Sequence, residues 1–257
     1  MSRTVPYLAE KHIEREAGAV LAEFEEARGL KLEPPIPIDD IVEKLLKLNI
    51  DFDDMHNRYN VPRSSNGQTD ILGAIYGDGS IFIDESLDPD ANPARQNRYR
   101  FTLAHEAGHW LLHRQLIMEE PAQPSLLDQD CEPKFICRLS QAKEPVEWQA
   151  DYFAASLLMP RDMVFAFWKQ CFPDDRPRVL NPPEGMSDAF VAIPRRYTQI
   201  EGRYVLETDD EALERVSKPL AERFQVSPIA MRIRLEGLEL LHRDSPRHWL
   251  LSDQLPF

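Results

Sequence analysis

The chain has 257 residues, of which 42% are hydrophobic and 29% charged, and a formal net charge of −14. A chain of this length can bury a sizeable core in one large domain or two small ones, and its composition is that of an ordinary globular protein. No apolar run reaches the roughly 18 residues of a membrane helix, and the acidic balance opposes unassisted binding to polyanions. The first residues lack the apolar run of a secretory signal, and the three cysteines include no C-x-x-C pair. We therefore expect a cytoplasmic protein without thiolate zinc ligands.

The N-terminal third predicts a helix, a connector and a small sheet. Apolar residues recur at helical spacing from residue 9 to 28, and Gly29 is a plausible stop. The proline-rich "KLEPPIPIDD" then leads into a short amphipathic helix. Residues 50–52 are typical of a strand start, and "ILGAIYGDGSIFID" predicts a β-hairpin around residues 77–80. A small mixed sheet is expected within residues 50–85.

The remainder of the chain is predicted to be mainly helical. Residues 92–93 are typical of an N-cap and a first helical position, so the helix that follows should carry residues 101–113. "PVEWQADYFAASLLMP" is helical, and a further helix should run to about Cys171. Residues 172–206 look irregular with some strand. The C-terminal end predicts two or three short helices with a turn near residues 225–227.

The stretch "TLAHEAGHWLLH" contains the pattern HExxH, from His105 through Glu106 to His109. Residues four apart on an α-helix differ by about 40° in direction and about 6 Å in rise, so two imidazoles can reach one ion. Zinc lowers the pKa of a bound water toward about 7, and Glu106 can then act as general base during attack on a carbonyl. The motif therefore predicts a zinc site in which Glu106 is the base and not a ligand.

The surroundings of the motif favour this reading. The rest of the helix is strongly apolar, and burying unpaired histidines and a glutamate costs several kcal/mol unless something binds them. Gly108 lowers the stability of a helix by about 1 kcal/mol relative to alanine, and its presence indicates that another group packs closely there. His113 lies about 12 Å along the axis from His105, too far to share an ion, so we expect it to be structural. Leu112 and Gln115 stand where metzincins need glycine and histidine.

A third ligand must come from another segment. Glu147 and Asp151 lie one helical turn apart in "EWQAD". Glu147 can complete a His₂Glu site, and Asp151 can accept the free N–H of a ligand histidine and fix its tautomer. In one alternative, Asp151 or Glu144 is the third ligand. In another, Glu147 and Asp151 bind no metal and only stabilise the N-terminal turn of their helix.

The motif segments together resemble the ImmA/IrrE family of zinc metallopeptidases. "RYRFTLAHEAGHWLLH" precedes "EWQADYFAASLLMP", and "IEREAGAVLAEF" and "PIPIDDIVEKLLKLNIDF" come before both. The tail "LAERFQVSPIAMRIRLEGLELL" is similar to the C-terminal module of many members, so the resemblance covers residues 9 to 242 or thereabouts.

The resemblance implies an α+β, zincin-like domain with a mainly α-helical active-site core and a small mixed sheet. One Zn²⁺ per chain would be held by His105, His109 and Glu147, with Glu106 as base; Mn²⁺ and Fe²⁺ fill similar ligand sets. Family members typically cleave an XRE-type helix-turn-helix repressor, which induces a mobile element or a stress regulon. The implied partner is a repressor on a separate chain, because this chain has no XRE domain ahead of the motif. The loop 114–145 also looks longer than is usual in the family.

The C-terminal tail has the layout of a helix-turn-helix, in which Arg232 and Arg234 are candidates for contacting phosphates, bases or a docked substrate. Residues 211–248 carry seven Lys and Arg against six Asp and Glu. Because DNA binding needs several phosphate contacts, this balance favours docking of a protein substrate over direct DNA binding.

These features predict three parts: a metallopeptidase domain at residues 1–171, a connector at 172–206, and a helix-turn-helix-like module at 207–257. The function expected is that of a zinc endopeptidase acting on a regulatory protein. The alternative from another class is a transcription regulator that senses zinc or a partner and acts through its C-terminal helices without hydrolysis.

Overall fold

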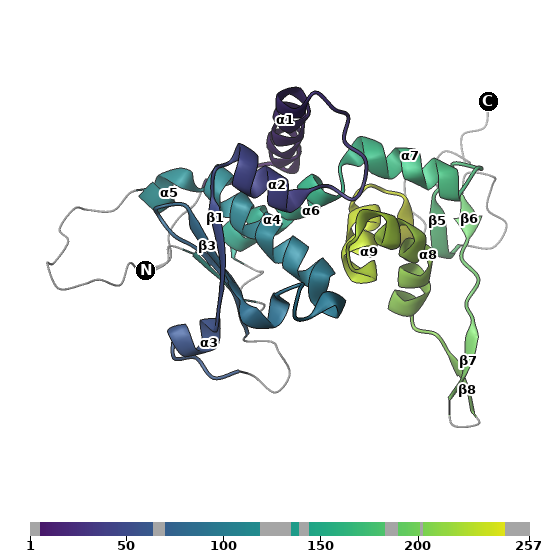
Figure 1. Ribbon diagram of the computed structural model, residues 1–257. Coiled ribbons are helices and arrows are strands. Elements are labelled where there is room, and N and C mark those ends of the chain that lie inside the picture. Colours follow the sequence, from purple (N-terminus) through teal and green to yellow (C-terminus); the bar gives the residue numbers. More distant parts are fainter. Residues whose placement is uncertain are drawn as a thin grey trace, which may run out of the picture. The chain divides into compact units, whose positions relative to one another are not determined.

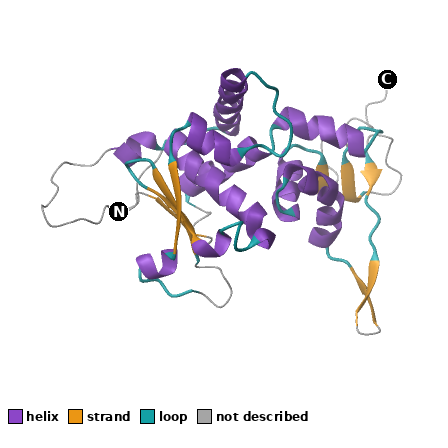
Figure 2. Ribbon diagram, in the orientation of Figure 1, coloured by secondary structure: helices purple, strands orange, loops and turns teal. Residues whose placement is uncertain are grey.

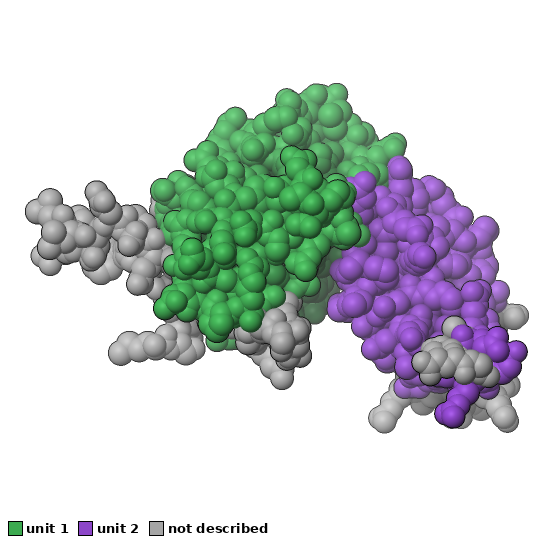
Figure 3. All heavy atoms as spheres, turned by 60° about the horizontal axis from the view of Figure 1, so that its bottom comes forward, with its two compact units in different colours: residues 1–160 green, residues 161–257 purple. Residues whose placement is uncertain are grey.

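The structure is a computed structural model, and it describes residues 6–63, 70–118, 135–138, 144–182, 190–200 and 203–244 (Figures 1 and 2). The chain separates into two compact units, residues 1–160 and 161–257, which are coloured separately in Figure 3. Among the described residues, no helix combines the length and the apolar character needed to cross a membrane.

The first unit carries most of the predicted elements. Its helices are α1 (Glu10–Arg28), α2 (Ile38–Asp40), the π-helical η1 (Ile41–Leu45), α3 (Met55–Arg58), η2 (Glu85–Leu87), η3 (Pro93–Arg95), α4 (Gln96–Leu112), α5 (Arg114–Met118) and α6 (Pro145–Leu158). Its strands are β1 (Asn49–Asp53), β2 (Ile71–Ile75), β3 (Ser80–Asp84) and β4 (Phe135–Arg138). The helix predicted to end at Gly29 is confirmed, because Gly29 adopts a left-handed conformation with φ of 61° directly after α1.

The sheet of this unit is mixed and has the order β1-β3-β2-β4. β1 runs parallel to β3, whereas β2 is antiparallel to both of its neighbours. The predicted hairpin is confirmed as β2 and β3, with Ala74 opposite Phe82. A cluster of buried residues next to the sheet includes Met55 of α3, Ala74 of β2 and Tyr76. α4 packs against β2, β3 and β4.

Three helices form the apolar centre of the first unit. α4 packs against α6, and α1 packs against α6 in turn. α1 buries one face at helical spacing, with Ile13, Ala17 and Phe24 among its buried side chains. α6 begins with Pro145 at its first position, where the missing N–H costs nothing, and buries Phe153 completely. This packing fixes which faces of α4 and α6 meet.

The second unit combines helices with two small sheets. It contains α7 (Arg161–Cys171), β5 (Arg178–Asn181), β6 (Val191–Ala192), β7 (Tyr197–Ile200), β8 (Arg203–Leu206), α8 (Asp209–Phe224), α9 (Pro228–Gly237) and β9 (Leu241–Asp244). β5 lies between β6 and β9, and β7 pairs with β8. The turn predicted near residues 225–227 is present, with Gln225 in a left-handed conformation between α8 and α9.

The compact units differ from the three-part division expected from the sequence. α7 falls in the second unit because Phe167 packs edge-on against Phe224 of α8, with the ring centroids 5.9 Å apart. Residues 172–206 supply strands to the sheets of that unit and are more regular than predicted. As domain boundaries, and as a helix-turn-helix module, the proposed parts at 1–171, 172–206 and 207–257 stay predictions. Most of the loop 114–145 lies outside the described residues.

Candidate metal centre

The two halves of the candidate site lie on α4 and α6, which approach each other closely. His105 and His109 stand one turn apart on α4, and Glu147 lies in the first turn of α6. The approach depends on Gly108, since a Cβ there would lie 3.1 Å from Phe153 Cδ1 and 3.3 Å from Ala150 Cα. The close packing predicted at Gly108 is therefore confirmed, but α6 causes it and not a metal.

Three side chains converge on one point. Ligand atoms of His105, His109 and Glu147 all lie within 4.8 Å of one another. His105 Nε2 lies 2.9 Å from His109 Nε2 and 3.1 Å from Glu147 Oε2, and His109 Nε2 lies 3.6 Å from the same oxygen. The three residues are only 2%, 0% and 5% exposed, in that order. Two imidazoles and a carboxylate in this spacing form a donor set that fits a zinc-like cation.

Asp151 orients the first of these histidines. Nδ1 of His105 lies 2.8 Å from Asp151 Oδ1. Because a carboxylate accepts, the ring proton resides on Nδ1, and the Nε2 lone pair is left for the convergent point. This is the position predicted for Asp151 from its place one turn after Glu147.

A longer chain of hydrogen bonds orients the second histidine. His109 Nδ1 lies 3.1 Å from His113 Nδ1, and His113 Nε2 lies 2.9 Å from Gln149 Oε1. The amide nitrogen of Gln149 donates to the carbonyl of Pro6 at 2.9 Å. Gln149 thus presents its oxygen to His113, so His113 donates from Nε2 and accepts at Nδ1. His109 then donates from Nδ1 and presents the Nε2 lone pair.

His113 therefore has the structural role expected of it. Gln149 was not singled out from the sequence, although it lies within the quoted "EWQAD" segment. Its residue type carries no ligand signal, and its pairing with His113 depends on how α6 faces α4. The contact with Pro6 lies far away in sequence, so no local pattern indicates it.

Glu106 points toward the sheet and is completely buried. Among the described residues, neither of its carboxylate oxygens has a hydrogen-bond partner. Burial raises the pKa of Glu106 to about 8, with the charge of Glu147 adding to this and His105 acting in the opposite direction. An unpartnered buried carboxyl is costly to maintain, and a nearby cation would favour its ionised form.

The protonation states of the other groups suit a cation. Burial lowers the pKa of His109 to about 3, so its imidazole is neutral near pH 7. Burial alone would raise the pKa of Glu147, but the adjacent imidazoles of His105 and His109 lower it to about 2. A neutral imidazole beside an ionised carboxylate is the state in which both groups bind metal.

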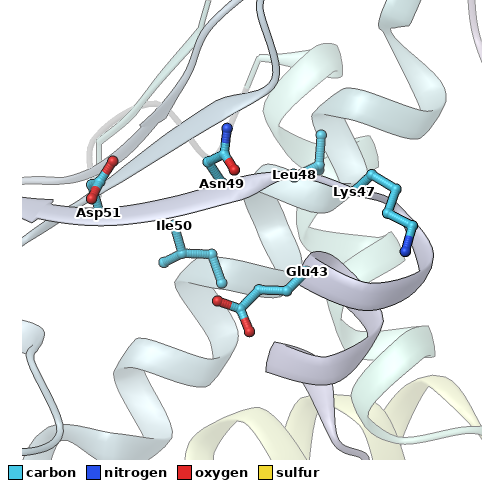
Figure 4. Close-up of a pocket in the computed structure, with 6 residues that line it drawn as sticks. All are labelled: Glu43, Lys47, Leu48, Asn49, Ile50 and Asp51. Carbon is cyan, nitrogen blue, oxygen red and sulfur yellow. The ribbon is translucent and has the colours of Figure 1, made fainter.

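The other carboxylates considered as ligands do not join the cluster. Glu144 occupies the N-cap position of α6 and is exposed. Asp151 contacts the opposite ring nitrogen of His105. A separate pocket along η1 and β1 contains none of the clustered residues; Figure 4 shows it lined by Glu43, Lys47, Leu48, Asn49, Ile50 and Asp51.

The two arginines on α9 considered for docking lie in enclosed surroundings. Arg232 is 12% exposed, and its guanidinium forms ion pairs with Asp210, Glu214 and Glu236. Arg234 is buried, with 5% exposed. The ion pairs of Arg232 connect α9 to α8, and the docking role of the two arginines stays a prediction. The sequence pattern did not indicate these ion pairs, because acidic residues of α8 supply two of the partners.

Comparison with known proteins identifies the domain that contains this centre. The family model Peptidase_M78, described as the IrrE N-terminal-like domain, matches residues 64–182. His105, Glu106, His109 and Glu147 all lie inside the matched segment. No curated protein matches the chain. Residues 64–182 therefore match the IrrE N-terminal-like domain of Peptidase_M78, in agreement with the ImmA/IrrE family that the motifs of the chain resemble.

Proposed function

We propose that this protein is a zinc-dependent endopeptidase that cleaves a regulatory protein. The observation that carries the proposal is the convergence of His105, His109 and Glu147 within 4.8 Å, with both imidazoles turned to present Nε2. Zinc, when bound, supplies Lewis acidity toward a carbonyl and lowers the pKa of a water. Mn²⁺ or Fe²⁺ in its place would use the same donors.

The chain's own residues have separable tasks in this reaction. Asp151 and His113 hold the two imidazoles in the required tautomers. Glu106 carries the proton: its carboxylate takes one from the attacking water and returns it to the leaving amine. The apolar surroundings of Glu106 exclude bulk water and keep that proton in the site.

The substrate we propose is an XRE-type helix-turn-helix repressor on a separate chain, whose cleavage relieves repression of a mobile element or a stress regulon. The family resemblance supports this substrate. The acidic chain and the enclosed Arg232 weigh against the alternative in which the protein binds DNA itself without hydrolysis.

A Glu106→Gln variant tests the reaction. It keeps the shape of the buried side chain but not the base, so zinc content and fold should persist while cleavage falls by about 10²–10⁴-fold. Cleavage is followed by intact mass spectrometry of XRE-type repressors from the same organism, each incubated with wild type or variant. A variant that still relieves repression in cells would favour the non-hydrolytic sensor.

A further inference from the structure

The backbone of β2 passes directly beside the proposed base. A Cβ at Gly73 would lie 2.9 Å from Glu106 Oε1 and 2.9 Å from Thr102 Cγ2. Only glycine therefore lets β2 come this close to α4 without displacing the carboxylate. At Gly73, β2 thus lies directly beside the proposed base.

Both sides of β2 are occupied at this position. Gly73 is paired with Ile83 of β3 on one side and with Cys137 of β4 on the other. β4 continues antiparallel along β2, with Ala74 opposite Ile136 and Ile75 opposite Phe135. An extended peptide that binds a sheet does so by adding to a free edge. With β4 in place, β2 offers no such edge beside Glu106.

The burial of the site agrees with this pairing. Glu106 and His109 are 0% exposed and His105 is 2% exposed. A scissile peptide bond must come within hydrogen-bonding distance of the base and the metal ligands. Some element must therefore move before a protein substrate can be cut.

β4 is held less firmly than the strands on the other side of the sheet. It is four residues long and, within the part of the chain that the structure describes, pairs with β2 alone. Its register with β2 shifts between Ile71 and Gly73, whereas β1 and β3 pair without interruption over five residues. Short, irregular edge pairing exchanges more readily than a continuous central ladder.

We propose that β4 is an inhibitory strand that occupies the place of the substrate peptide on β2. This inference rests on the proposed function. An extended segment of the substrate protein replaces β4 antiparallel to β2, beside Gly73 and Glu106, and cleavage requires β4 to leave. The chain as folded here is therefore the self-blocked form of the enzyme.

Ala74 allows a matched test, because it is the paired residue of both Ile136 on β4 and Phe82 on β3. Ala74 belongs to the buried cluster with Met55 and Tyr76, so a cross-link there avoids Glu106. The test variant is Ala74→Cys with Ile136→Cys, and the control is Ala74→Cys with Phe82→Cys. Paired residues on adjacent strands lie within disulfide reach. Both variants are made with the native cysteines, Cys131, Cys137 and Cys171, replaced by serine.

The probe is a fluorescent peptide hydroxamate, whose binding to zinc-loaded protein is measured by polarisation before and after reduction. A disulfide between residues 74 and 136 keeps β4 on β2, so the conformation that binds peptide is not populated. The oxidised Ala74→Cys, Ile136→Cys variant should therefore bind the probe at least about tenfold more weakly than its reduced form. The Phe82 pair should bind equally in both states. Equal binding by both redox states of the Ile136 pair would overturn the inference.

A second variant guards against misfolding of the cross-linked protein. Phe135→Gly with Ile136→Gly lowers the strand propensity of β4 without adding a bond, so the probe should bind more tightly than to wild type. Unchanged binding would again overturn the inference. The zinc content of the same samples separates the two proposals. If the protein contains zinc and the binding results above are not obtained, only the inhibitory strand is contradicted. If the protein takes up no zinc, the proposed function is contradicted as well.

Discussion

At the scale of single residues, the position of ring protons decides what the histidines can do. His105 donates from Nδ1 to Asp151, and His109 donates from Nδ1 toward His113. Either histidine in its other tautomer would place an N–H at the convergent point and repel a cation. The carboxylate and the histidine behind the ligands therefore contribute to metal affinity without touching the metal.

Asp151 gives the cleanest test of this orientation, because its side chain is 38% exposed and its loss opens no buried cavity. Asp151→Ala should weaken zinc binding by about 10–100-fold, as for other outer partners of ligand histidines. Asp151→Asn keeps an oxygen that accepts from Nδ1 and should recover part of the loss. Competition with a chromophoric chelator measures both. Equal affinities for all three proteins would contradict the assigned tautomer.

Asp84 provides a pH-dependent contribution to stability that is independent of the metal. Its carboxylate accepts hydrogen bonds from Arg63 at 3.0 Å and from the backbone N–H of Ser86 at 3.1 Å. Burial alone would raise the pKa of Asp84, but these hydrogen bonds lower it below its ordinary value of 3.8. A lowered folded-state pKa stabilises the protein above the unfolded-state value, and the stabilisation is lost as the pH falls through the folded-state value.

Asp84→Asn should therefore be less stable than wild type at pH 7, by about 1–3 kcal/mol for a buried charge-assisted hydrogen bond. We expect a value near the lower end of this range, because the side chain of Arg63 is 42% exposed and solvent screens its charge. The difference should shrink as the pH falls below 3.8. Urea unfolding at several pH values measures it, and a difference that stays constant down to pH 3 or so would refute the assignment.

At the scale of elements, the site depends on how closely α4 and α6 approach. Glu147 reaches the two histidines only because Gly108 lets the backbone of Ala150 pack against α4. The helix thus gives up about 1 kcal/mol of propensity at Gly108 in exchange for contact with α6.

Replacing Gly108 by alanine should reverse this balance. The overpacking cost of about 1–3 kcal/mol outweighs the helical gain of about 1 kcal/mol, so the free energy of unfolding should fall by up to about 2 kcal/mol. Gly18→Ala on α1 is the matched control, since a Cβ there meets nothing within 4 Å, and it should be stabilising. Chemical denaturation compares the two. A stabilising Gly108→Ala would contradict the close approach.

At the scale of the whole molecule, sequence patterns predicted the elements that local chemistry determines. The helix ending at Gly29, the hairpin of β2 and β3, and the helices carrying HExxH and "EWQAD" follow from periodicity, capping and turn residues. The metal-binding residues could also be predicted from the sequence. HExxH places two ligands on one helix, and the third ligand must then come from a neighbouring helix.

The long-range features could not be read from local patterns. The pairing of β4 with β2 joins segments separated by α4, and the partners of Arg232 lie partly on α8. The chain of contacts from His109 through His113 and Gln149 ends at Pro6, which lies before α1 in the sequence. Each depends on tertiary packing, which overrides the propensity of any single segment.

We expect His105, His109 and Glu147 to bind one metal ion, and the metal content of the purified protein tests this. Wild type, Glu147→Ala and the control Glu144→Ala, whose exposed glutamate lies at the start of the same helix, are equilibrated with zinc and analysed by mass spectrometry. We predict one zinc per chain in wild type and in the control. In Glu147→Ala, zinc should be lost or its affinity reduced beyond the roughly 10–100-fold effect of an outer partner. Wild type that takes up no metal, or a Glu147→Ala variant that binds zinc as tightly as wild type, would contradict this set of ligands.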